Sequence, residues 1–226
     1  GELQLTVENH QVTSFNGKLL QLWVRHTVPG NELTKLVGEF KTVVDRDYGE
    51  TIGTLASDWK RGGGGETNIG NFISDAIREG ASAQVGITNT SGIRKDLRAG
   101  SVTKLDMFEI CPFRNVLCTF TLSGKELRAL AERYAQSLMD GKSSIQLSGL
   151  QCSWKRADAK AILVSLSVGG TEVQDEKTYL CGTSDFVINQ GDKYLGMATV
   201  GVTFSPTTVY QAMVEKVKKE KTIGAQ

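Results

Sequence analysis

The sequence contains no long hydrophobic run and carries almost no net charge. No stretch approaches the ~20 consecutive apolar residues that a bilayer-spanning helix requires, so we expect no membrane span. The formal net charge is +1, which gives no electrostatic reason to expect nucleic acid or an anionic membrane as the main partner. The first residues, Gly1–Gln4, lack the basic and apolar regions of a signal peptide, so we expect any export signal to be removed or to lie outside this sequence.

Histidine is scarce, and several catalytic motifs are missing. His10 and His26 are the two histidines, and neither lies in an HExxH or DxH setting. Two-metal phosphatases need several His and Asp ligands to hold their ions ~3.5–4 Å apart. The sequence also has no GxSxG motif, and Gly62–Gly65 is followed by Glu66-Thr67 in place of the Lys-Ser/Thr of a P-loop. We therefore predict no catalytic residue and no metal ligands in this chain, and no hydrolytic activity for the chain alone.

The four cysteines, Cys111, Cys118, Cys152 and Cys181, form no CxxC pair. This spacing argues against a zinc knuckle or a thioredoxin-type motif. Each cysteine has apolar neighbours, which favours buried free thiols that pack as small hydrophobic side chains. One or two disulfides remain an alternative if the protein is exported.

Strand-like and helix-like hydrophobic patterns alternate along the chain. Near the N-terminus, Leu3, Leu5 and Val7 alternate with polar residues, and turns are expected at Asn9-His10 and Asn16-Gly17 before a strand at 19–24. Helices are expected at 31–47, 68–79, 103–110, 123–138 and 207–221, further strands at 85–88, 116–121, 145–154, 161–168, 178–181 and 200–204, and a loop at 184–194. This interleaving predicts an α/β (α+β) fold with a mixed sheet.

Three features have two interpretations each. The apolar face of helix 31–47 is more typical of a core than of a binding surface. Gly62–Gly65 favours a flexible connector over an anion-binding loop. The basic run Lys216–Lys221 favours a solvated helix face over an adhesion or assembly surface.

Four collinear segments resemble the C-terminal domain of the 5'-nucleotidase family. They are Thr67–Ala76, similar to the family's N-x-G-N-hydrophobic-x-x-D-A; Ile87–Arg94, similar to T-N-G-G-G-I-R; Glu109–Asn115, similar to P-F-x-N; and Ser184–Asp192, similar to N-D-F-x-x-x-G-G-D. The resemblance covers residues 66–205. It implies a layered mixed-sheet domain at 61–226, a linking helix and connector at 31–60, and tail strands of a metallophosphatase domain at 1–30.

The resemblance also implies a base-binding site. The family holds the base between two aromatic rings, and the matching positions are Phe113 and Phe186. Aromatic stacking tolerates any base and contributes ~1–3 kcal/mol per contact. Asn115 matches a position that hydrogen-bonds the base edge. Without the resemblance, both phenylalanines would be interpreted as core residues.

Four further positions match residues that contact the sugar and phosphate side. Asp192 matches a carboxylate that accepts hydrogen bonds from the ribose hydroxyls, although a Gly-Asp pair is usually a turn. Arg94 matches a guanidinium that reaches the ribose near the phosphate. Asn89 and Gly92 match the turn that presents Arg94, and Asn89 alternatively only ends a strand.

The resemblance implies a nucleoside- or nucleotide-binding domain of an exported phosphohydrolase. Two divalent metal ions are expected in an N-terminal metallophosphatase domain, in the same full-length chain or in a separate one, and this domain would hydrolyse the phosphate ester. The alternative is a stand-alone, non-catalytic nucleoside-binding or scaffold module.

Overall fold

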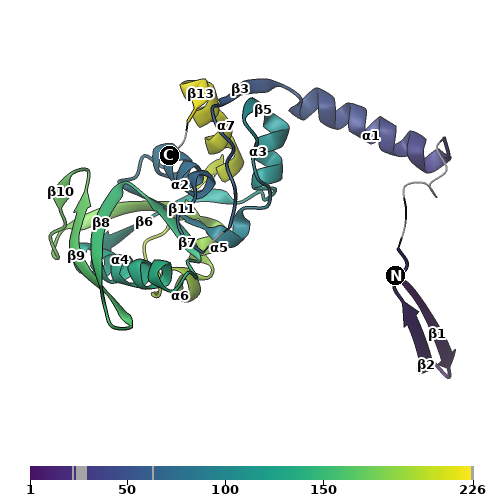
Figure 1. The fold of residues 1–226 in the computed structure, drawn as a ribbon, viewed down its shortest axis with the longest axis horizontal. Coiled ribbons are helices and arrows are strands. Elements are labelled where there is room, and N and C mark those ends of the chain that lie inside the picture. The colour runs from purple at the N-terminus through teal and green to yellow at the C-terminus, as the bar shows by residue number, and fades with distance from the viewer. Residues whose placement is uncertain (22, 24–29, 63, 225–226) are drawn as a thin grey trace. The chain divides into compact units, whose positions relative to one another are not determined.

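The computed structural model describes residues 1–21, 23, 30–62 and 64–224, and the chain divides into two compact units. The first comprises Gly1–Val43 and the second Val44–Gln226. Helix α1 (Glu32–Tyr48) begins in the first unit and ends in the second. Figure 1 shows the elements of both units along the chain.

The first unit begins with a two-stranded antiparallel hairpin, β1 (Glu2–Glu8) and β2 (Gln11–Lys18). Asn9 and His10 form its turn with φ of 50° and 62°, which confirms the first expected turn. The second expected turn was wrong, because Asn16 and Gly17 lie inside β2. In the expected strand 19–24, residues 22 and 24 lie outside the described residues, and the other four are not in a strand.

The apolar faces of this unit are exposed. Leu5 pairs with Phe15 and Val7 with Val12 on one face of the hairpin, and these side chains are all more than half exposed. Helix α1 is confirmed with Asn31 as its cap, since Asn31 Oδ1 accepts from Thr34 N at 2.9 Å. The expectation that its apolar face is core was wrong, since none of its residues is buried.

A five-stranded mixed sheet organises the second unit, in the order β12-β6-β11-β4-β7. Its strands are β4 (Val85–Asn89), β6 (Val116–Ser123), β7 (Ile145–Ser148), β11 (Thr178–Ser184) and β12 (Thr203–Thr208). Strands β4 and β11 are parallel, and β6, β7 and β12 each run antiparallel to their neighbours. The fold class predicted from the sequence is therefore confirmed.

Helix α2 (Asn68–Gly80) packs closely on one face of this sheet. Gly86 and Gly182, paired in register on β4 and β11, allow the approach, because a Cβ at Gly86 would lie 2.1 Å from the carbonyl oxygen of Ser74. Helices α3 (Lys104–Ile110) and α7 (Val209–Glu220) and a small sheet, β13-β3-β5, complete this core. The strands β3 (Thr51–Leu55), β5 (Gly100–Thr103) and β13 (Thr222–Ile223) were not expected from the sequence.

Helix α4 (Gly124–Met139) and the sheet β8-β9-β10 cover the opposite face (Figure 1). The expected capping box of Ser123 and Glu126 is present at the start of α4. The expected strand 145–154 is two strands, because Gly149 at φ +81° separates β7 from β8 (Leu150–Ala157). Strand β8 pairs with β9 (Lys160–Val168), which turns through Gly169-Gly170 into β10 (Thr171–Glu172).

Two local expectations need correction. The segment expected as a loop at 184–194 contains two short helices, α5 (Asp185–Ile188) and α6 (Gly191–Tyr194). Lys216 is not part of a solvated helix face, because its side chain is 4% exposed and is bound by two carboxylates.

Candidate functional site

The candidate site lies at one edge of the five-stranded sheet. Strands β4 and β11 are parallel, so their carboxyl ends share an edge. Because β6 is antiparallel to β11, its start lies at the same edge, with Leu117 beside Ser184. The end of β12 also lies here, since Thr208 pairs with Val116. Segments far apart in the sequence therefore meet, and polar residues that follow strands β4 and β11 lie beside those that precede β6.

A cavity of about 230 Å³ opens at this edge. Six of the seven residues singled out in the sequence line it: Asn89, Gly92, Arg94, Phe113, Asn115 and Phe186. The other lining residues are Ile73, Thr88, Ser91, Ile93, Cys111, Ser184 and Val209. Asp192 is not among them; it is exposed in the first turn of α6.

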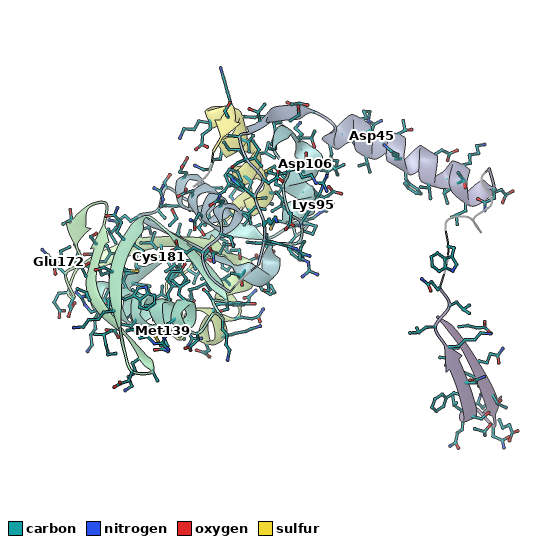
Figure 2. All side chains as sticks on the ribbon, in the orientation of Figure 1. Asp45, Lys95, Asp106, Met139, Glu172 and Cys181 are labelled. Atoms are coloured by element: carbon teal, nitrogen blue, oxygen red, sulfur yellow. The ribbon has the colours of Figure 1, made fainter. Side chains whose placement is uncertain are left out.

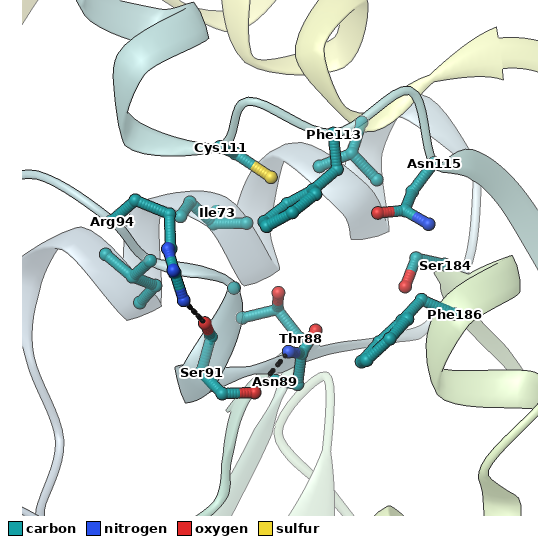
Figure 3. Close-up of a pocket in the computed structure, with 13 residues that line it drawn as sticks. Ile73, Thr88, Asn89, Ser91, Arg94, Cys111, Phe113, Asn115, Ser184 and Phe186 are labelled. Atoms are coloured by element: carbon teal, nitrogen blue, oxygen red, sulfur yellow. Dashed lines mark hydrogen bonds between the residues drawn. The ribbon is translucent and has the colours of Figure 1, made fainter. Parts of the chain in front are cut away.

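Two phenylalanine rings border the open space of this cavity (Figure 3). Phe113 is 40% exposed and Phe186 is 37% exposed, although the core buries Phe72 and Phe120 almost completely. Phe186 leans on Tyr194, with ring centroids 5.9 Å apart. Among the described residues no ring contact joins Phe113 to Phe186, and both rings line the same cavity.

Asp185 connects the segments that carry the two rings. Its Oδ1 accepts from Asn115 Nδ2 at 2.7 Å and from its neighbour Phe186 N at 2.8 Å. Ser184, at the end of β11, caps helix α5 by accepting from Val187 N. These bonds fix the first turn of α5 against the start of β6.

The turn after β4 forms the opposite wall. Asn89 Nδ2 donates to Ser91 Oγ at 2.9 Å, and Ser91 Oγ is 3.2 Å from the Tyr194 hydroxyl. Arg94 Nη1 donates to the Ser91 carbonyl at 3.2 Å, and its guanidinium is exposed at the cavity wall (Figure 3). Gly92 packs against the Asn89 amide, because a Cβ there would lie 3.2–3.5 Å from three of its atoms.

The segment that leads to Phe113 is held by helix α3. Thr103 and Asp106 form a capping box at its start, and Lys95 pairs with Asp106 at 3.4 Å (Figure 2). A hydrogen bond from Lys95 to Glu109 contributes most to raising the Lys95 pKa. Arg94 N donates to the carbonyl of Ile110 at 2.8 Å, which joins the Arg94 turn to the end of α3.

The cavity contains polar residues that the sequence analysis missed. Thr88 lies one residue before the end of β4, Ser184 ends β11, and Ser91 lies in the turn between Asn89 and Gly92. Asp185 directly precedes Phe186, so its position in the fourth segment was the available signal. Cys111 also reaches the cavity, and burial raises the pKa of its thiol to about 11. It is a free thiol, as are the other three cysteines.

The described residues do not fit a metal centre. Residues 1–21, 23, 30–62 and 64–224 contain no group of three or more His, Cys, Asp and Glu side chains that could hold a metal ion. We therefore derive no chemical step through a metal from these residues.

Residues 49–199 match the family model described as "5'-nucleotidase, C-terminal domain". The chain belongs to the 5'-nucleotidase C-terminal domain family. This confirms the resemblance found in the sequence. In the part of the chain described, no helix is long and apolar enough to cross a membrane.

Curated relatives of this family member are much longer than the chain. It is 29% identical over 176 residues to "Endonuclease YhcR" of Bacillus subtilis, a match that covers 76% of this chain and 14% of that protein. It is 29% identical over 162 residues to "Protein UshA" of Salmonella pullorum, covering 72% of this chain and 29% of the relative. The chain thus spans less than a third of these relatives.

Solved structures share the fold. The 5'-nucleotidase precursor of Thermus thermophilus superposes with a TM-score of 0.71 at 23% identity, covering 99% of this chain and 47% of that one. The NAD nucleotidase of Haemophilus influenzae gives a TM-score of 0.68 at 22% identity, covering 85% of this chain and 39% of that one.

Proposed function

We propose that this chain is the nucleoside-binding part of a 5'-nucleotidase-type phosphohydrolase. The observation that carries the proposal is the pair of partly exposed rings, Phe113 and Phe186, at one cavity with amide and guanidinium groups between and beside them. A nucleobase is a planar group with polar edges. It would stack on the rings and present its edge to Asn115.

The sugar and phosphate would extend toward the Arg94 side of the cavity. Arg94 carries a permanent positive charge, and only its Nη1 donates to the described protein residues, so the guanidinium suits a ribose oxygen or a phosphate. Asn89 and Gly92 would shape this wall. Asp192 would reach the ribose only after a movement of α6, because it does not line the cavity.

A separate metallophosphatase domain would supply the two divalent metal ions and hydrolyse the phosphate. The apolar hairpin face of Leu5, Val7 and Phe15 supports such a partner, because an isolated two-stranded hairpin is marginally stable in water. The exposed apolar face of α1 supports it also. The greater length of the relatives agrees with this division.

The test is a calorimetric titration of the chain with adenosine and with AMP, repeated with the double variant Phe113→Ala/Phe186→Ala. Two stacking contacts at ~1–3 kcal/mol each predict a loss of affinity of about 25-fold or more, at about 1.4 kcal/mol per tenfold. The matched control is Phe204→Ala, which removes a ring that is 58% exposed and does not line the cavity. Equal affinities of the parent and the double variant would refute the aromatic site, whereas no binding by the parent would favour the scaffold alternative.

A further inference from the structure

The amide of Asn115 is held in one orientation by a carboxylate. Asp185 Oδ1 lies 2.7 Å from Asn115 Nδ2, and a carboxylate can only accept hydrogen bonds. The amide nitrogen must therefore face Asp185. The amide oxygen of Asn115 then points toward the cavity, as Figure 3 shows.

The bond spans 70 residues and depends on the sheet register. Asn115 lies just before β6 and Asp185 just after β11, and these strands are adjacent and antiparallel. Asp185 is itself fixed by the backbone N–H of Phe186 at 2.8 Å. A rotation of the Asn115 amide would place its oxygen against a carboxylate oxygen, which is repulsive. The cavity therefore presents a hydrogen-bond acceptor here.

The side-chain amide of Asn89, the second amide of the cavity, is oriented in the same way, with its nitrogen bound to the protein. Asn89 Nδ2 donates to Ser91 Oγ at 2.9 Å, so its nitrogen is bound within the turn. Among the described residues no protein group donates a hydrogen bond to Asn89 Oδ1 or Asn115 Oδ1, and neither atom is fully buried. Both amides therefore have an oxygen that can accept from a ligand.

We propose that Asp185, acting through Asn115, selects a nucleobase that carries an exocyclic amino group on the edge facing Asn115. Such an amine donates to the fixed amide oxygen, whereas a base without a donor at this position leaves the oxygen unpaired when water is displaced. Asp185 is a positioning residue in this account, because it does not line the cavity itself. This inference rests on the proposed nucleoside site and adds the class of base that the site prefers.

Adenosine and purine riboside provide the direct test, because they differ only in the 6-amino group. We expect the full chain to bind adenosine up to about tenfold more tightly, the ratio that one net hydrogen bond supplies. Calorimetry would give this ratio for the parent and for Asp185→Ala, Asp185→Asn and Asn115→Leu. Thermal unfolding of each variant would establish that it is folded.

The ratio should fall below about threefold in Asp185→Ala, because the Asn115 amide is then free to rotate, and to about one in Asn115→Leu. Asp185→Asn should retain the parent ratio, because its side-chain oxygen still accepts from Asn115. A purely structural role for Asp185 would weaken both nucleosides equally and leave the ratio unchanged. The matched control, Asp175→Ala, removes a carboxylate that pairs with Arg128 away from the cavity and should keep the ratio.

Two outcomes would overturn the inference. In the first, the parent binds both nucleosides equally and the variant Phe113→Ala/Phe186→Ala binds neither. This result would refute base selection but would leave the aromatic site supported. In the second, Asp185→Ala keeps a tenfold preference, which removes Asp185 from the selection. Binding of neither nucleoside by the parent would refute the proposed function and this inference together.

Discussion

Lys216 joins the two helices that contribute to the cavity wall, and this contact yields a prediction about stability. Its Nζ lies 2.6 Å from Glu79 Oε1 on α2 and 2.7 Å from Glu220 Oε1 on α7. The lysine side chain is 4% exposed, whereas the two glutamates are 30% and 32% exposed. The cation therefore depends on its partners more than they depend on it.

The two ways of breaking this cluster should have unequal costs. The double variant Glu79→Gln/Glu220→Gln leaves the buried Lys216 ammonium without a charged partner from these two sites, and removing the partners of a buried charge costs ~3–5 kcal/mol. Because glutamine oxygens still accept hydrogen bonds and the sites are partly exposed, we expect about 2–3 kcal/mol. Lys216→Met keeps the apolar stem and returns two carboxylates to water, so it should cost within ~1 kcal/mol.

Urea denaturation followed by circular dichroism would measure both values. For a domain of this size about 2–3 kcal/mol corresponds to a fall in Tm of roughly 5–10 °C. A larger loss of stability in Lys216→Met than in the double glutamine variant would refute the reasoning. It would mean that the attraction between Lys216 and the two glutamates is larger than the free-energy cost of burying the lysine cation.

The pH dependence of the same cluster follows from its pKa directions. Burial is the largest single influence on Glu79 and opposes ionisation, but hydrogen bonds from Lys216 and Lys219 together outweigh it and lower the Glu79 pKa. A carboxyl group whose pKa is lower in the folded protein stabilises the fold at any pH above its pKa in the unfolded chain, which is about 4. This stabilisation is lost as the pH falls through the pKa of the group in the folded protein. Lys216→Met should therefore become more stable than the parent in acid, measured by urea denaturation at about pH 3 and pH 7.

Three further predictions concern a glycine, two cysteines and an arginine. Gly149→Ala should destabilise the fold by at least ~2 kcal/mol in urea denaturation, because the φ of Gly149 is +81° and a Cβ would lie 2.1 Å from a backbone carbonyl oxygen. Gly170→Ala is the matched control and should cost only about 1 kcal/mol, because Gly170 has a φ of +77° but open space around it. In thiol labelling followed by mass spectrometry at about pH 8, half-buried Cys152 should react before Cys181, whose pKa burial raises to about 12; equal rates would contradict the described packing. Arg94→Met should weaken AMP binding by about tenfold and adenosine binding less, as measured by calorimetry, and an equal loss would place the guanidinium away from the phosphate.

Six of the seven site positions expected from the sequence line one cavity, and they come together because they lie at or next to strand ends. Asn89 ends β4, Asn115 precedes β6 and Phe186 follows β11, and hydrophobic runs mark these strands clearly. The pairing order of the strands then brings these ends to one edge. The motif resemblance implies the roles of these residues, and the sheet topology brings them close together.

Other features had no local signal. The glycine at Gly149 resembled a weak position inside one strand, but its positive φ redirects the chain into a second sheet. The periodicity of α1 indicated an apolar face but could not say whether that face is buried, and none of its residues is buried in the structure. The bond between Asn115 and Asp185 depends on strand pairing between distant residues, so neither residue type nor spacing could predict it.

The same bond that orients Asn115 also connects the supports of the two rings. Phe113 lies two residues before Asn115, and Phe186 directly follows Asp185, so one hydrogen bond couples the segment of each ring to the other. If the rings are already held in place, binding does not have to order them, and the ordering cost of ~0.5–1.5 kcal/mol per immobilised side chain is avoided. Asp185→Ala should therefore weaken all nucleosides through looser rings and also lower the preference for an amino group. Absolute affinity reports the first effect and the adenosine-to-purine-riboside ratio the second, which makes the two contributions of one carboxylate separable.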